Sequence, residues 1–300
     1  MTPFNNGYIS VAIAAVFWGT IGLFVKILGG MGLSIEAIVF IRLFYGCLIL
    51  ALIMYMKSGS YFKVDLKGLA LLAFMGVFTQ AAFNLVYFKT IEVIGVASAA
   101  VLVYVAPVLI TLLSRLIFKE VLNPFKKIGL VICLLGAFMA ITGGRMETLN
   151  MDQKGILLGL LSAVIYAMLS ITSKIAIERY DPLTVVFYSF LFGTMAISPF
   201  VPHEDFMMMF SKLDMIMLSF TMGLVPAAFA YFSYFRGIGQ KIDLSIVGII
   251  STLELLVSVL IGRLFLNESI TALKMVGLSL IMLSIFISQY QGHKVNKKLV

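Results

Sequence analysis

The chain has 300 residues, of which 61% are hydrophobic and 12% are charged, and its mean hydropathy is +1.08. Soluble domains carry about 25% charged residues, so this chain has too few charges to cover a surface that faces water. The formal net charge is +8, but the basic residues are dispersed between apolar runs. This dispersal argues against a nucleic-acid-binding surface and is typical of the Lys/Arg bias beside membrane spans.

Apolar windows predict ten transmembrane helices, each about long enough to cross the ~30 Å hydrocarbon core of a bilayer. In chain order they cover 8–28, 35–55, 68–89, 95–117, 124–142, 155–175, 183–200, 214–235, 243–264 and 273–290. The segments between them are short, which leaves no room for a soluble domain. The predicted fold class is therefore an all-α membrane protein.

The sequence repeats itself at an offset of 147–148 residues. GVFTQAAFNLVYFKTI (76–91) aligns with GLVPAAFAYFSYFRGI (223–238), and SRLIFKE (114–120) aligns with GRLFLNE (262–268). The same register pairs Trp18 with Tyr166. We predict four regions: a first five-helix repeat at 1–142, a connecting loop at 143–154, a second five-helix repeat at 155–290, and a basic cytoplasmic tail at 291–300.

Each predicted repeat has five spans, an odd number, so the two repeats must lie in opposite orientations in the membrane. Many secondary transporters are built from such inverted repeats and bind substrate near the midplane between them. An even total of spans puts both termini on one side, where Lys and Arg are roughly twice as frequent as on the other. The excess predicts cytoplasmic termini in a multi-pass protein of the plasma (inner) membrane.

Glu254 is the first candidate functional residue, because it is the one formal charge in the apolar run 244–262. An ionisable residue inside a membrane span is costly and often functional. Its carboxyl group could carry a proton or face the ammonium group of a substrate. The alternative is a structural Glu that pairs with a cation or is hydrogen-bonded within the bundle.

Arg42, in IVFIRLFYG (38–46), is the one basic residue well inside a predicted span. Its guanidinium stays charged, so it must find an anion, a carbonyl or water. It could bind a substrate carboxylate in bidentate fashion, pair with Glu254, or extend toward one membrane surface. The sequence leaves these three readings open.

Aromatic and amide side chains near the middle of predicted spans are candidates for the lining of a substrate pocket. Trp18, Tyr104 and Tyr166 could line an apolar pocket with a few polar groups, or they could be packing residues. Gln80 and Asn84 lie one helical turn apart on one face. Their amides need partners, which neighbouring helices or a ligand could provide.

Two prolines and two glutamates mark positions where helices bend or end. Pro107 and Pro226 remove backbone hydrogen bonds and allow kinks or gating motions. Glu120 and Glu268 follow predicted helix ends and precede turn residues. Since a carboxylate is favourable near a helix N-terminus, we expect both to be structural caps.

Motifs for the common enzymatic chemistries are absent from the sequence. It has no GxxxxGK[ST] nucleotide loop, no HExxH and no GxSxG, and neither of its two histidines lies in a predicted span. We therefore expect no metal site, no cofactor and no enzymatic activity.

The duplicated helix endings LLSRLIFKE (112–120) and VLIGRLFLNE (259–268), with FWGT (17–20) and YVAPVL (104–109), resemble the EamA family of the drug/metabolite transporter superfamily. The resemblance covers roughly 8–290. It implies ten helices, cytoplasmic termini and transport of small metabolites, often the export of amino acids or related compounds. One departure lies at TLEL (252–255), where the family commonly has TLEP, so the second repeat lacks a counterpart of Pro107.

The leading functional hypothesis is a secondary transporter, and more specifically an exporter of small metabolites that works by alternating access and is coupled to protons through Glu254. The main alternative is a multidrug or cationic-compound exporter in which Glu254 is the counter-charge. A membrane-embedded enzyme and a passive channel are weaker alternatives. The expected partners are a small-molecule substrate, the lipid bilayer and protons, with a monomer and a homodimer both open.

Overall fold

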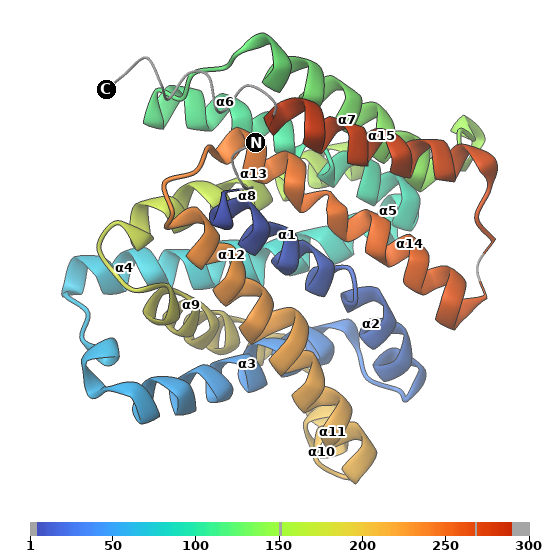
Figure 1. The fold of residues 1–300 in the computed structure, drawn as a ribbon. Helices are drawn as coiled ribbons and strands as arrows, with labels where there is room; N and C mark the ends of the chain where they lie inside the picture. The colour runs from blue at the N-terminus through green and yellow to red at the C-terminus, as the bar shows by residue number, and fades with distance from the viewer. Residues whose placement is uncertain (1–4, 150–151, 268, 290–300) are drawn as a thin grey trace.

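The computed structural model describes residues 5–149, 152–267 and 269–289, and all regular secondary structure in these ranges is helical. The longer helices of the first half (residues 5–142) are α1 (Asn6–Trp18), α2 (Ile21–Gly30), α3 (Ile35–Lys57), α4 (Leu66–Phe74), the π-helical η2 (Met75–Ala82), α5 (Phe83–Val103), α6 (Ala106–Phe118) and α7 (Pro124–Thr142). Those of the second half (residues 153–289) are α8 (Gln153–Ile177), α9 (Pro182–Ile197), α10 (His203–Met209), α11 (Leu213–Met222), the π-helical η5 (Gly223–Phe229), α12 (Ala230–Ile238), α13 (Leu244–Ser251), α14 (Leu253–Leu266) and α15 (Ala272–Gln289). Figure 1 shows their arrangement. The predicted tail at 291–300 and the predicted cap Glu268 lie outside the described residues.

Within the described ranges, nine helical stretches are long and apolar enough to cross a membrane, and Ala106–Phe118 is a shorter apolar helix. One of the nine, Leu66–Val103, has 38 residues, about twice the length that a bilayer requires. Gly95 interrupts it with φ 81° and ψ 164°, a conformation that glycine adopts without steric cost. The interruption falls at the predicted boundary between the helices 68–89 and 95–117.

Three predicted helices are divided near their middles, and this corrects the expected continuous spans 8–28, 95–117 and 243–264. The breaks lie at Gly19–Thr20, at Tyr104–Val105 and at Thr252. At two of them a threonine hydroxyl donates to the carbonyl three residues earlier, Thr20 to Phe17 at 2.7 Å and Thr252 to Ile249 at 2.6 Å. Such local bonds compete with the helical ladder.

At the remaining break, Pro107 has no backbone N–H to donate to the carbonyl of Val103. The second half breaks at the corresponding place without a proline, since Thr252 stands 148 residues after Tyr104. The helix break therefore occurs in both halves although TLEL (252–255) contains no proline.

The two halves pack against each other through several pairs of helices. α7 lies beside α15, as Figure 1 shows at its top, α6 packs on α13, and α3 packs on α9. α1 packs on α12, and α5 packs on α8. The breaks of α5–α6 and α13–α14 thus face each other across the boundary between the halves.

Candidate functional site

Glu254 lies in the first turn of α14, directly after the break at Thr252. The backbone N–H of Leu255 bonds to the Thr252 carbonyl at 3.0 Å, in a tight turn. The first N–H groups of a helix carry a partial positive charge that favours a carboxylate. The break therefore gives an acidic side chain inside the bundle a favourable electrostatic position.

Tyr104 lies at the break in the other half and contacts Glu254 directly. Its hydroxyl donates a hydrogen bond to Oε1 of Glu254 at 3.1 Å. Pro107 stands at the start of α6, where proline is well tolerated because the first helical N–H groups have no partner within the helix. One hydrogen bond thus joins the two breaks.

A small cavity lies between these breaks, with room for roughly one water molecule. Its lining comes from both halves: Val103, Tyr104, Ala106, Pro107, Tyr166, Gly248, Ser251, Thr252 and Glu254. Glu254 is the one charged residue in this lining. The lining thus combines aromatic rings, hydroxyls and a single carboxyl group.

Arg42 does not line this cavity and does not pair with Glu254 in the part of the chain that the structure describes. It is buried in α3, with 7% of its surface exposed, and its Nη2 donates to Oδ1 of Asn84 at 3.4 Å. The Asn84 side-chain amide in turn donates to the backbone carbonyl oxygen of Gln80 at 2.5 Å. The guanidinium thus points into the bundle, which corrects the alternative that it extends to a membrane surface.

Aromatic rings connect the Arg42 region with the Glu254 region. The Trp18 ring lies 5.1 Å from the Tyr231 ring and 4.9 Å from the Tyr234 ring, centroid to centroid. Tyr231 lies within electrostatic range of both Arg42 and Glu254. Trp18 therefore packs against these two tyrosines and, unlike Tyr104 and Tyr166, does not line the small cavity.

Gly19 lets the end of α1 approach α14 closely. A Cβ at this position would lie 2.7 Å from the Glu254 carbonyl oxygen and 2.5 Å from Val257. The absence of a side chain therefore brings Trp18 close to the turn that carries Glu254.

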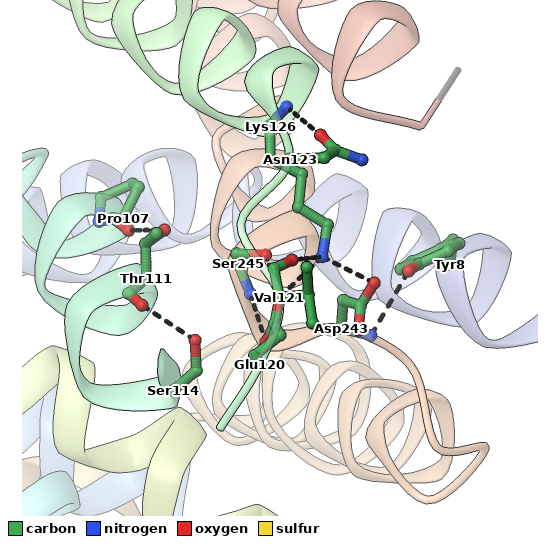
Figure 2. A network of polar contacts seen from close by, with 10 residues as sticks. All are labelled: Tyr8, Pro107, Thr111, Ser114, Glu120, Val121, Asn123, Lys126, Asp243 and Ser245. Carbon is green, nitrogen blue, oxygen red and sulfur yellow. Dashed lines mark hydrogen bonds and ion pairs between the residues drawn. The ribbon is translucent and has the colours of Figure 1, made fainter. Parts of the chain in front are cut away.

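A second polar cluster lies at one end of the α6–α13 pair and is shown in Figure 2. Lys126, whose side chain is 5% exposed, contacts Glu120 at 3.1 Å and Asp243 at 2.8 Å. Ser245 hydrogen-bonds to Glu120 through its hydroxyl, and the Asp243 N–H donates to the Tyr8 hydroxyl at 3.3 Å. The cluster joins α7 and the α6–α7 loop to the start of α13.

Glu120 does not cap the helix that follows it, but it contacts the first turn of α13. Asn123 is the N-cap of α7, and its side chain accepts from the Lys126 N–H at 2.8 Å, as asparagine commonly does at this position. Glu120 pairs with the Lys126 side chain, and its Oε2 accepts from the Ser245 N–H at 3.4 Å, at a helix N-terminus where a carboxylate is favourable.

Pro226 lies inside the π-helical segment η5, and Gln80 lies inside the π-helical segment η2. The two segments occupy corresponding positions in the repeat register, since Gly76 aligns with Gly223. Single π-turns often occur at functional sites. The sequence offered Pro226 as a signal for the second segment but none for the first.

The sequence analysis missed Tyr231, Thr252 and Lys126. Thr252 follows a run of apolar residues and Tyr231 lies in an aromatic-rich segment, so neither stands out in the sequence. Lys126 could have been noticed, because KKIG (126–129) repeats as KMVG (274–277). Within the described ranges, no three His, Cys, Asp or Glu side chains lie close enough to hold a metal ion.

Comparison with known proteins identifies the group to which these features belong. The EamA-like transporter family matches residues 5–142 and again 153–290. An uncharacterized transporter of Archaeoglobus fulgidus is 28% identical over 94% of this chain and 96% of its own length. The uncharacterized inner membrane transporter YicL of Salmonella typhimurium is 26% identical over 94% and 95%, respectively.

A solved structure extends the comparison to the fold. This crystal structure of a protein has a TM-score of 0.79 and 18% sequence identity, and the match covers 96% of this chain and 98% of that one. At this identity the likeness establishes a shared fold alone.

Proposed function

The chain belongs to the EamA-like transporter family, and we propose that it exports a small metabolite, such as an amino acid or a related compound, across the plasma (inner) membrane. It is a multi-pass membrane transporter and not an enzyme. The observation that carries the proposal is the Tyr104–Glu254 contact inside a cavity lined by both halves. Helix breaks at midspan are where transporters place their substrate and ion sites.

We propose that the two halves are inverted five-helix repeats, each ending near the bounds of a family match. The pattern of helix packing supports this. Packing of α1 on α12 has its counterpart in packing of α8 on the η2–α5 segment, and packing of η2 on α9 has its counterpart in packing of η5 on α3. The pairs α3–α9 and α7–α15 each join a helix to its own repeat counterpart. Such reciprocity is expected of a pseudo-twofold axis.

Contacts between connecting segments support ten crossings. Lys126, in the first turn of α7 beside the fourth connection, contacts Asp243 in the eighth, and Asp243 also contacts Tyr8 near the N-terminus. On the opposite side, Ser34 in the first connection donates its N–H to Asp205 in the seventh at 3.1 Å. If the chain turns at Gly95 and crosses the membrane ten times, the even-numbered segments between spans lie on one side and the odd-numbered ones on the other. The observed contacts join even segments to even ones and odd segments to odd ones, as this arrangement requires.

We place both termini in the cytoplasm because the connections on their side carry the larger share of Lys and Arg. Glu254 is the proposed proton-coupling or substrate-facing residue, with Tyr104 and Tyr166 beside it. Pro107 and Pro226 lie at the places where α6 and η5 would bend when the halves rock. The cavity is small in this conformation, so substrate enters only after such a movement.

An exporter of lipophilic cations is the second candidate function. It is favoured by the single carboxyl group among aromatic rings in the cavity, since aromatic faces and a carboxylate both attract cations.

Reconstitution in liposomes tests the proposal. Proteoliposomes loaded with a mixture of amino acids, monocarboxylic acids, amines, nucleosides and tetraphenylphosphonium are expected to release a subset with saturable kinetics and no chemical change. Release of tetraphenylphosphonium alone would favour the second candidate. Non-saturable release would indicate a channel, and release of none above protein-free liposomes would refute the proposal.

A further inference from the structure

Arg42 is a buried cation whose hydrogen-bonding capacity is largely unused. A guanidinium has five N–H donors, yet the one hydrogen bond found for Arg42 among the described residues is the long contact of 3.4 Å to Asn84. Its Nε has no partner in the described part of the chain. A buried charge without an anionic partner is unfavourable, so this arrangement suits a group that arrives with a negative charge.

Gln80 adds a second unused polar group beside Arg42. Its side chain is fully buried, and neither its Oε1 nor its Nε2 makes a hydrogen bond of normal geometry with the described residues. The Tyr231 hydroxyl interacts with this amide, but no hydrogen bond of normal geometry joins the two side chains. Buried amides normally have partners, so an amide donor without one beside a guanidinium points to a missing acceptor.

We infer that Arg42, Gln80 and Tyr231 form the subsite for a carboxylate group of the transported molecule. The inference rests on the proposed transport function and deepens it. Arg42 would bind the carboxylate through parallel N–H donors, and Gln80 and Tyr231 would each donate one further hydrogen bond. Arg42 supplies the one positive charge among these three residues, so the subsite is matched to one negative charge. A dianion such as a phosphate monoester fits this site poorly.

Tyr231 relates the subsite to Glu254, because it interacts electrostatically with both Arg42 and Glu254, although it does not line the cavity itself. Arg42 comes from α3, Gln80 from η2 and Tyr231 from α12, so both halves contribute. A substrate with its carboxylate at Arg42 would extend along Tyr231 toward Glu254. Because both halves contribute to the subsite, a movement of one half relative to the other would change the contacts made with the bound carboxylate.

The experiment compares release of carboxylic acids and of their primary amides from proteoliposomes. The panel contains amino acids and monocarboxylic acids, the amide of each, and amines without a carboxyl group. For wild-type protein we expect each transported acid to exceed its amide by about 10- to 100-fold, the range expected for charge-assisted hydrogen bonds. Equal release of acids and amides would overturn the carboxylate subsite but leave transport intact. Release of no compound would instead overturn the proposed function.

Variants then assign the discrimination to the subsite. Arg42→Met is expected to bring the acid-to-amide ratio close to 1 by slowing the acid far more than the amide, whereas Arg263→Met, a change at an exposed position, keeps the wild-type ratio. An unchanged ratio in folded Arg42→Met would overturn the inference.

Gln80→Met keeps the test decisive if Arg42→Met does not fold. Because no hydrogen bond of normal geometry holds the Gln80 amide, its replacement by an apolar side chain should lower the melting temperature little. Its KM for acids should rise about tenfold through loss of a charge-assisted bond. A lower melting temperature with an unchanged KM would show a structural role and overturn the inference.

Discussion

The Tyr104 hydroxyl lies 3.1 Å from Oε1 of Glu254, and this contact connects the end of α5 in the first half with the first turn of α14 in the second. Tyr104 and Thr252 occupy corresponding positions in the repeat, yet the first half has no carboxyl group at the position of Glu254. The contact is therefore asymmetric although the helix breaks on both sides correspond. A movement that separates the halves must stretch or break it.

Glu254→Gln should fold normally and make transport insensitive to an imposed pH gradient. Glutamine keeps the size of the glutamate side chain and can still accept a hydrogen bond from Tyr104, but its amide cannot bind and release a proton near neutral pH. The measurement is the initial rate of substrate release from proteoliposomes with and without the gradient. Tyr104→Phe is the matched control, since it removes the hydrogen bond and leaves the carboxyl group, and its transport should still respond to the gradient. Unchanged pH dependence in Glu254→Gln would remove the proton role.

Arg42→Met and Glu254→Met should have independent effects on stability, because the structure shows no ion pair between these residues. Their changes in unfolding free energy are expected to add within about 0.5 kcal/mol. The measurement is thermal unfolding of the purified single and double variants, together with their yields. Recovery in the double variant of yield lost in both singles would reveal a direct pair and contradict this expectation.

Lys126→Met should destabilise the protein by about 3–5 kcal/mol, because it leaves the buried Glu120 carboxylate without its cation. Asp243 has 41% of its side chain exposed, so it adds little to this effect. Thermal unfolding in detergent measures the change. Lys127→Met, at the neighbouring exposed position, should have a small effect.

Adding Glu120→Gln to Lys126→Met should restore part of the lost stability, since it removes the unpaired charge. If Lys126→Met is as stable as Lys127→Met, the cluster in Figure 2 does not stabilise the contact between the halves.

Gly277→Ala should push α7 and α15 apart. The added Cβ would lie 2.4 Å from the Ala140 nitrogen and 2.7 Å from the Gly136 oxygen, and backbone atoms cannot move away as a side chain can. We expect a loss of about 1–3 kcal/mol, as for other overpacked positions. Gly30→Ala, where no atom lies within 4 Å of the added Cβ, should be neutral or gain up to about 1 kcal/mol. Equal melting temperatures for the two variants would contradict the close α7–α15 packing.

Most of the candidate site residues could be identified from the sequence, but their hydrogen-bond partners could not. Glu254 and Arg42 stood out because a charge in an apolar run is costly and rare. The sequence left a direct pair between them open, whereas the structure places Glu254 with Tyr104 and Arg42 with Asn84. Pairing depends on which helices approach each other, and residues about 150 positions apart carry no local signal of that approach.

The sequence by itself determined the membrane class, most of the span positions, the repeat register and the intramembrane charges, since these depend on hydrophobicity and periodicity along the chain. Only the tertiary structure decided the break at Thr252 without a proline, the π-turn at Gln80 and the contacts of Glu120 with Lys126 and with the first turn of α13. Each of these depends on which donors and acceptors meet in three dimensions. A buried polar group is stabilised by its actual partner, and the fold alone supplies that partner.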